Sequence, residues 1–341
     1  VYRRADIRAG KARIKEWDYY LAANDHFAVA LTIADNGYMG LDSISFLQFD
    51  ERWEQTKSPM RVFPMGRTGL PETSAAGDTV IAGSGYGMAF RHVGNARVLT
   101  FRMEDFLAGM PIEGRLMLTE EPEESMVIAT PFDQPRCFYF NQKINCMRVS
   151  GEVRVEGRVF RFAPEDSFAV LDWGRGVWTY HNTWYWGSAS GQVDGVPFGW
   201  NIGYGFGNTN TWFWGSGNGT VAGKPFGFNI GYGFGDTSAA SENMLFYGGK
   251  AHKLGQVQFL IPMKNGREDY LSPWRFTSDD GRFEMDFMPI LDRAACMDVK
   301  LLKSDQHQVF GRFTGRAVLD DGREIRVSDF LGFAEKVENK W

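Results

Sequence analysis

The sequence predicts an all-β protein built from two antiparallel β-barrels or sandwiches. Aromatic residues make up 15% of the 341 residues, β-branched residues recur in short runs, and turn dipeptides separate these runs at hairpin spacing. Helical patterning is scarce. Because one open sheet seldom exceeds about ten strands, a chain of this length with many hairpins favours two sheets over one.

The clearest hairpin joins Phe27–Asp35 to Tyr38–Phe49 through Asn36-Gly37, a dipeptide that suits the positive backbone angles of a tight turn. Four further hairpins are predicted at turn dipeptides flanked by short apolar segments. They are Gly94-Asn95, Glu156-Gly157, Asp280-Gly281 and Asp321-Gly322. Together these turns predict an antiparallel meander.

A short helix is predicted at the C-terminus, over Asp329–Lys340. Asp329 would cap it, and one apolar stripe would consist of Phe330, Phe333, Ala334 and Val337. We expect this helix to close a barrel.

A domain boundary is predicted near Ala163-Pro164, ahead of the segment that is richest in motifs. This gives an N-terminal barrel over residues 1–165 and a C-terminal barrel over residues 166–341. The length of the chain is compatible with one large domain or two ordinary domains.

Residues 182–237 form a tandem repeat with a period of 28. The copies 182–209 and 210–237 are identical at 20 of 28 positions. Each copy is predicted to be a hairpin, which in the first runs from Thr183–Gly191 through a turn at Gln192–Gly195 to Val196–Gly207. An added hairpin preserves the alternation of a sheet, so the sheet can widen to absorb it. The alternative is that the second copy forms a long loop.

The return strand of the first copy has one bulky face and one nearly bare face. The bulky face carries Phe198, Trp200, Ile202, Tyr204 and Phe206, and the other carries Gly199, Asn201, Gly203, Gly205 and Gly207. Glycine contributes no side-chain packing, so another group must lie close to the bare face. A barrel bend or a neighbouring sheet is the commoner reason, and a bound ligand is the alternative.

Charge and cysteine content restrict the partners and the compartment. The net charge of −5 comes from 37 basic and 42 acidic residues with no long run of one sign, so no nucleic-acid partner is expected. Apolar stretches such as Phe27–Ala34 are too short for a membrane helix, so no integral membrane segment is expected. Three cysteines without a CxxC pair suit a reducing compartment, which favours the cytoplasm.

The candidate site lies in residues 171–187, where titratable and hydrogen-bonding groups occur among tryptophans, a mixture that small-molecule pockets use. The candidates for catalysis are Asp172, Tyr180 and His181. The candidates for ligand binding are Trp173, Arg175, Trp178, Asn182, Trp184 and Trp186, with Asn201 and Asn229 from the repeat. The structural alternative is that Asp172 pairs with Arg175 while the tryptophans fill a core.

No metal or cofactor is expected. The histidines are scattered without an HxH or HExxH pattern, and the cysteines do not join them. The repeated Gly-Tyr-Gly-Phe-Gly lacks the Lys-Ser/Thr of a phosphate loop, and no GxSxG elbow is present.

Segments spread over the whole chain resemble the bacterial family called domain of unknown function 2804. They are Lys15–Tyr20, Asn141–Cys146, Asp172–Gly187, Asn229–Tyr247 and Asp329–Trp341. In that family the aromatic-glycine hairpin occurs once, so the second copy is a departure of this chain. The resemblance implies an organisation and no established activity.

Asp172-Trp173-Gly174, ahead of an aromatic-rich strand, is similar to the aspartate-tryptophan-glycine region of the lipocalin-like carotenoid hydratases and tocopherol cyclases. That resemblance implies two calycin-like β-barrels, a hydrophobic ligand and a cytoplasmic protein without a cofactor.

Three functions follow from these observations. The favoured one is a lipocalin-like protein that binds a small apolar partner such as a lipid or terpenoid. The second is a cofactor-free hydratase, isomerase or cyclase in which a protonated Asp172 donates a proton, His181 or Tyr180 acts as base, and the tryptophans stabilise a cation. A nearby Arg175 would oppose this by keeping Asp172 ionised. The third is an interaction module that uses the aromatic repeat as an adhesive surface and therefore forms an oligomer.

Overall fold

The computed structural model describes residues 2–132, 134–193, 196–207, 213–221, 224–232, 242–247, 250–299 and 302–340. The chain divides into two compact units. Unit 1 is Val1–Glu121 with Phe140–Val177, and unit 2 is Pro122–Tyr139 with Trp178–Trp341. The division into 1–165 and 166–341 stays a prediction about which parts fold on their own.

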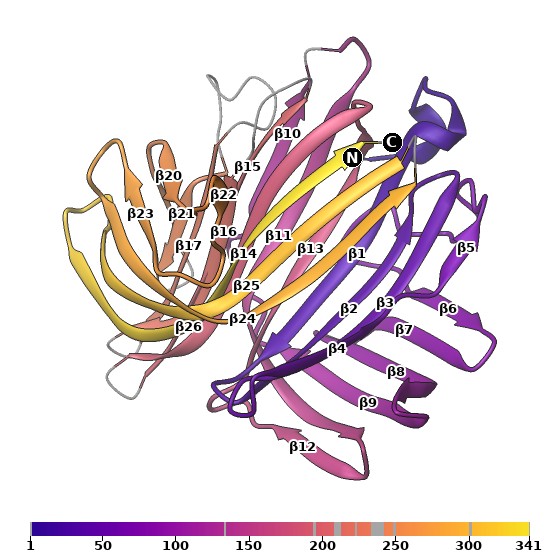
Figure 1. The fold of residues 1–341 in the computed structure, drawn as a ribbon, viewed down its shortest axis with the longest axis horizontal. Helices are drawn as coiled ribbons and strands as arrows, with labels where there is room; N and C mark the ends of the chain where they lie inside the picture. Colours follow the sequence, from indigo (N-terminus) through magenta and orange to yellow (C-terminus); the bar gives the residue numbers. More distant parts are fainter. Residues whose placement is uncertain are drawn as a thin grey trace. The chain divides into compact units, whose positions relative to one another are not determined.

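The described part of the chain is all-β, as predicted, with two large antiparallel sheets (Figure 1). Its only helices are two single 3-10 turns, η1 (Arg4–Asp6) and η2 (Lys11–Arg13). In the same described residues, no helix has the length and apolar character needed to cross a membrane.

The first sheet has the strand order β4-β3-β2-β1-β13-β11-β9-β8-β7-β6, with β5 on β3 and with β10 and β12 on β11. The strands are β1 (Ile14–Ala23), β2 (Phe27–Asp35), β3 (Met39–Gln48), β4 (Trp53–Lys57), β5 (Met60–Val62), β6 (Thr79–Gly83), β7 (Tyr86–Val93), β8 (Ala96–Leu107), β9 (Met110–Thr119), β10 (Met126–Pro131), β11 (Phe138–Val155), β12 (Arg158–Phe162) and β13 (Phe168–Val177).

Strand β1 lies in the middle of this sheet and carries the site described below. Trp17 is opposite Ala34 of β2 on one side and Gly174 of β13 on the other. Nearly every residue of β1 and all residues of β13 are buried, on both faces. Polar side chains on these strands therefore lie away from water and must find partners inside the protein.

The sheet curls so that strands distant in its order come together. Lys57 of β4 forms an ion pair of 2.7 Å with Asp105 of β8. Tyr86 of β7 donates a hydrogen bond of 2.9 Å to Asp42 of β3. The first contact lies at the surface of unit 1 and the second is buried.

The predicted hairpin turns are confirmed. Asn36-Gly37 joins β2 to β3 with a φ of 80° at the glycine, a backbone angle that favours glycine. The turns at Gly94-Asn95, Glu156-Gly157, Asp280-Gly281 and Asp321-Gly322 likewise connect consecutive antiparallel strands.

The second sheet has the order β19-β18-β17-β16-β15-β14-β26-β25-β24-β23-β20 and curls into a half-barrel (Figure 1). Its strands are β14 (His181–Val193), β15 (Val196–Gly207), β16 (Phe213–Val221), β17 (Lys224–Tyr232), β18 (Met244–Tyr247), β19 (Lys250–Lys253), β20 (Val257–Leu260), β23 (Trp274–Ser278), β24 (Phe283–Val299), β25 (Leu302–Val318) and β26 (Glu324–Lys340). A separate hairpin consists of β21 (Met263–Lys264) and β22 (Arg267–Glu268).

Both copies of the repeat join this sheet, so the sheet widens instead of extruding the second copy. Strands β14 and β15 form the first predicted hairpin, and β16 and β17 form the second. Both copies also reach β26, where Trp184 of the first copy is opposite Val337 and Trp214 of the second is opposite Glu335. Of the two outcomes that the sequence left open, the structure has the hairpin inserted within the sheet.

The prediction of a C-terminal helix is wrong, because this segment is strand β26. Asp329 is not a helix cap. It has a φ of 50° and lies at a bulge, where the register of pairing with β25 shifts. The residues from Phe330 to Val337 are buried without interruption, so they have neighbours on both faces. Pairing with β25 and β14 therefore outweighs the local helical pattern.

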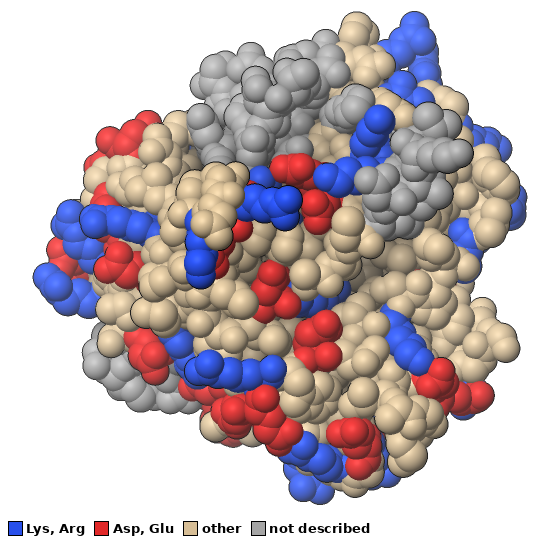
Figure 2. Space-filling model, viewed as in Figure 1, with Lys and Arg blue, Asp and Glu red and all other residues tan. Residues whose placement is uncertain are grey.

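Acidic and basic side chains alternate over the face shown in Figure 2. This mixed surface agrees with the small net charge of −5.

Candidate functional site

A buried polar cluster in unit 1 surrounds Asp172 of β13. One carboxylate oxygen of Asp172 accepts a hydrogen bond from the Asn141 amide and lies 3.0 Å from the Lys143 ammonium. The other accepts a hydrogen bond of 3.2 Å from the Trp17 indole. All three partners are donors, and they stabilise the ionised carboxylate. Lys143 is fully buried.

Strand alternation explains how this cluster forms. Asn141, Lys143 and Asn145 occupy alternate positions on β11 and therefore point to the same face, on which Asn141 and Lys143 contact Asp172 of the neighbouring β13. Together with Trp17 of β1, these residues are called the Asp172 cluster below. Three central strands of one sheet thus supply every member.

Close packing of Trp17 explains why the Asp-Trp-Gly motif ends in a glycine, Gly174. Gly174 is opposite Trp17, and a Cβ added to it would lie 2.0 Å from two atoms of the indole. The bare backbone lets the Trp17 ring lie flat across β13 and reach Asp172. The group that packs against the bare backbone of Gly174 is thus Trp17, a side chain of the protein itself.

The Asp172 cluster contains polar atoms that the described residues do not satisfy. Asn145 is 2% exposed, and neither its amide nitrogen nor its amide oxygen has a hydrogen-bond partner among the described residues. The amide oxygen of Asn141, which is wholly buried, is also without one in that part of the chain. A buried polar group without a partner costs about 1–3 kcal/mol, so these atoms would gain from a hydrogen-bond partner that the described residues do not supply.

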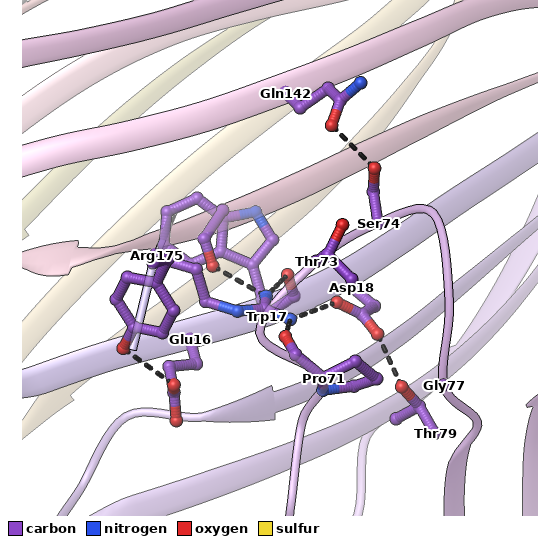
Figure 3. Close-up of polar contacts among 12 residues, drawn as sticks. Glu16, Trp17, Asp18, Pro71, Thr73, Ser74, Gly77, Thr79, Gln142 and Arg175 are labelled. Carbon is purple, nitrogen blue, oxygen red and sulfur yellow. Dashed lines mark hydrogen bonds and ion pairs between the residues drawn. The ribbon is translucent and has the colours of Figure 1, made fainter. Parts of the chain in front are cut away.

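Arg175 lies on the opposite face of the sheet from Asp172, because it is three residues further along the strand. It forms an ion pair of 3.0 Å with Asp18 and donates hydrogen bonds to the carbonyl oxygens of Trp17, Gly174 and Pro71 (Figure 3). The sequence-based alternative in which Arg175 pairs with Asp172 is wrong: each residue has its own partner.

The Arg175 network holds the segment between β5 and β6 against the sheet (Figure 3). Asp18 accepts a hydrogen bond of 2.6 Å from Thr79, and Ser74 donates one of 2.6 Å to Gln142. The Arg175 guanidinium also lies 4.1 Å from the ring centre of Trp173. Its contacts are all internal, so we interpret this face as structural.

The other predicted site residues belong to unit 2. Trp178 is buried and packs against Phe132, Tyr139 and Trp184 at ring-centre distances of 5.0–5.7 Å. Tyr180 is 45% exposed.

Two more of them have internal partners. Asn182 is buried and donates to the Thr179 carbonyl oxygen at 3.0 Å. The Trp184 indole donates to Glu335 at 2.9 Å.

Four candidates lie in strands of the repeat, and their side chains lie outside the described part of the structure. They are His181 and Trp186 of β14, Asn201 of β15 and Asn229 of β17. Their roles stay predictions.

Sequence reasoning found Asp172 but assigned no role to Trp17, Asn141, Lys143 or Asn145. The available signal was the pattern Asn-x-Lys-x-Asn, which places three polar side chains on one face of a strand in an otherwise apolar region. Within the described residues, no group of three His, Cys, Asp or Glu side chains is arranged to hold a metal ion.

Fold and site define a class: an all-β protein of two units, with a buried and incompletely satisfied polar cluster in one of them. The chain belongs to the family described as "Domain of unknown function (DUF2804)", whose profile matches residues 1–211 and 208–341. The two matched segments meet where the two copies of the repeat meet. No curated protein sequence matches the chain.

Two solved structures share this fold. One is kievitone hydratase from Nectria haematococca, at 9% identity and a TM-score of 0.50, covering 100% of this chain and 93% of that chain. The other is the Nitrosomonas europaea protein NE1406, described as a "putative AttH", at 12% identity and a TM-score of 0.51, covering 100% of this chain and 96% of that chain. At these identities the likeness shows the fold alone.

Proposed function

We propose that the protein binds a small, mainly apolar molecule through a hydroxyl or carbonyl group at the Asp172 cluster. The observation that carries this proposal is the Asn145 amide, buried with both polar atoms unpartnered among the described residues. A hydroxyl group donates and accepts hydrogen bonds, so it can pair with the oxygen and the nitrogen of one amide. Binding would remove the cost of leaving these atoms unsatisfied.

The charges of the cluster favour a neutral ligand. Lys143 and Asp172 form a pair of opposite charges 3.0 Å apart, so the cluster offers no net charge to an ionic group. A charged ligand would lose its hydration without gaining a counter-ion, which is costly in a buried site.

The aromatic residues of β1 suit the apolar remainder of the ligand. Trp17 and Tyr19 alternate on the same face of the strand as the cluster, and Tyr19 is buried. Aromatic walls with a few convergent polar groups are typical of sites for small molecules.

A matched pair of probes tests this proposal. Isothermal titration calorimetry would compare 1-naphthalenemethanol with 1-methylnaphthalene, which lacks the hydroxyl. We expect the alcohol to bind about tenfold more tightly, the equivalent of one well-formed hydrogen bond. Asn145→Ala should abolish that preference, while Asn95→Ala, at an exposed turn, should retain it. Equal binding of both probes, or no binding of either, contradicts the proposal.

A second candidate function is addition of water to a carbon–carbon double bond, which the buried Lys143–Asp172 pair favours. Asp172 would take a proton from water as the oxygen bonds to one carbon, and the Lys143 ammonium would give a proton to the other carbon. Transfer of the proton from Asp172 to Lys143 restores the pair. This assigns Asp172 the role of base, because its described partners are donors.

Isotope labelling tests the catalytic version. Once a bound molecule is identified, incubation in ¹⁸O water should label the product in the wild type, and Asp172→Asn should remove the label. Unlabelled product in the wild type would leave binding as the function. Kievitone hydratase is named for such a reaction, and that name describes that protein.

A further inference from the structure

Unit 2 has a surface cavity that is wide open to solvent and whose lining residues lie far along the sequence from the Asp172 cluster. It has a volume of about 590 Å³ and is lined by the hairpin of β21 and β22, by the segment that follows, and by Asp292 of β24. This volume lies within the range of small-molecule sites, about 300–1,000 Å³. The lining residues used below are Lys264, Arg267, Glu268, Asp269, Tyr270 and Asp292.

One carboxylate oxygen of Asp292 has a hydrogen-bond partner, and the other has none among the described residues. Its Oδ2 atom lies 2.7 Å from Nδ1 of His307 on the neighbouring strand β25. Its Oδ1 atom is buried and has no hydrogen-bond partner in the described part of the chain. An acceptor in that state needs a donor, and a carboxylate needs one more strongly than a neutral group does.

The surrounding side chains hold Asp292 in place. The His307 ring stacks on Tyr270, with ring centres 4.0 Å apart and planes inclined by 20°. The Tyr270 hydroxyl in turn donates a hydrogen bond of 2.7 Å to Glu268. Nε2 of His307 lies 3.8 Å from Asp305, so a second carboxylate also orients the ring. Asp292 is therefore a fixed acceptor beside an aromatic wall.

The other acidic groups of the lining have positive partners. Glu268 pairs with Lys336, and Asp269 lies 3.8 Å from Lys264. Arg267 is exposed, so water screens its charge. Asp292 has His307 beside its Oδ2 atom, but its Oδ1 atom is an acceptor of the described lining that lacks a hydrogen-bond donor.

We infer that this cavity binds a protonated primary amine, whose ammonium group donates to Oδ1 of Asp292 while its apolar part lies against Tyr270. An ammonium group supplies both the hydrogen bond and the charge that a carboxylate favours. His307 acts as a positioning residue, since it contacts Asp292 and not the ligand. This site is independent of the function proposed for unit 1.

Calorimetric titration of the full chain with benzylamine and with its neutral analogue benzyl alcohol tests the inference. We expect benzylamine to bind at least about tenfold more tightly, because a charge-assisted hydrogen bond is stronger than a neutral one. Asp292→Asn should remove this preference. The matched control is Asp286→Asn, on the same strand but exposed and outside this cavity, which should retain it.

A measurement on the wild type covers the case in which Asp292→Asn does not fold. The ring resonances of His307, assigned with His307→Gln, should shift when benzylamine is added and should stay in place with benzyl alcohol. Equal affinity for the two probes, or an amine that leaves the His307 resonances unchanged, overturns the inference. Benzylamine binding that Lys143→Met weakens as strongly as Asp292→Asn would also overturn it, because the site would then lie in unit 1.

Discussion

The ammonium of Lys143 and the carboxylate of Asp172 lie 3.0 Å apart, and the lysine side chain is fully buried. Such a pair contributes little net stability, because desolvation of the two ions offsets much of their attraction. Removal of one partner, in contrast, leaves an uncompensated charge in the interior. Measurements of unfolding free energy can therefore show how strongly the two charges interact, independently of any ligand.

Lys143→Met should destabilise the protein by about 3–5 kcal/mol, because it leaves Asp172 without its counter-ion. The double variant Lys143→Met/Asp172→Leu should recover most of that loss. Urea unfolding of the two single variants and the double variant measures the coupling. Single and double variants with additive losses would show that the two charges do not interact.

Gly174→Ala should displace the Trp17 indole, because the added Cβ would lie 2.0 Å from two of its atoms. We expect a loss of about 1–3 kcal/mol, typical of overpacking, together with loss of the hydrogen bond from Trp17 to Asp172. Near-ultraviolet circular dichroism and unfolding measure the two effects. Gly10→Ala is the control, since no atom lies within 4 Å of its added Cβ. An unchanged tryptophan spectrum in Gly174→Ala would contradict the packing described here.

The stability of unit 2 should depend on pH through His307. Burial lowers the pKa of His307, but the hydrogen bond with Asp292 and the charges of Asp292 and Asp305 outweigh burial and raise the pKa above its ordinary value. The folded protein then holds this proton more tightly than the unfolded chain does. The stabilisation is complete below the unfolded pKa of about 6.5 and is lost as pH rises through the folded pKa.

The unfolding free energy lost in His307→Gln should therefore be largest below about pH 6.5 and should shrink at higher pH. Urea unfolding of both proteins across this range is the measurement. A difference that grows with pH would mean that the folded protein prefers the neutral ring.

Removal of residues 182–209 should leave a folded protein. Trp214 of the second copy corresponds to Trp186 of the first copy. Because Trp184 is opposite Val337, the same register places Trp186 opposite Glu335, and Trp214 is also opposite Glu335. The second copy can thus replace the first without a change of register. Removal of 182–208, one residue fewer, should be much more damaging, because a slip by one position reverses every side chain. Equal melting temperatures for the two deletions would disprove the shared register.

Local sequence patterns were enough to predict most of the fold. Asn36-Gly37 and the other turn dipeptides define hairpins because a tight turn and its two strands involve adjacent residues. The C-terminal segment was mispredicted because its helical spacing of apolar residues also fits a strand that is buried on both faces. Only its pairing with β25 and β14, set by distant parts of the chain, decides between the two.

The candidate site could be predicted only in part for the same reason. Asp172 was recognised from its neighbours in sequence, but its partners Asn141 and Lys143 lie on β11 and Trp17 lies on β1. The order β1-β13-β11 joins strands far apart in the chain, and a single sequence does not reveal that order. The pairing of Arg175 with Asp18, 157 residues away, was hidden in the same way.

Native mass spectrometry of the freshly purified protein, followed by extraction and identification of any released molecule, is the direct test of ligand binding at the Asp172 cluster. We expect one apolar molecule with a hydroxyl or carbonyl group on each wild-type chain and on Asn95→Ala, and a clearly lower occupancy on Asn145→Ala. An adduct that is equally abundant in Asn145→Ala, or a wild-type chain that stays unliganded after incubation with mixed lipids and terpenoids, would contradict it.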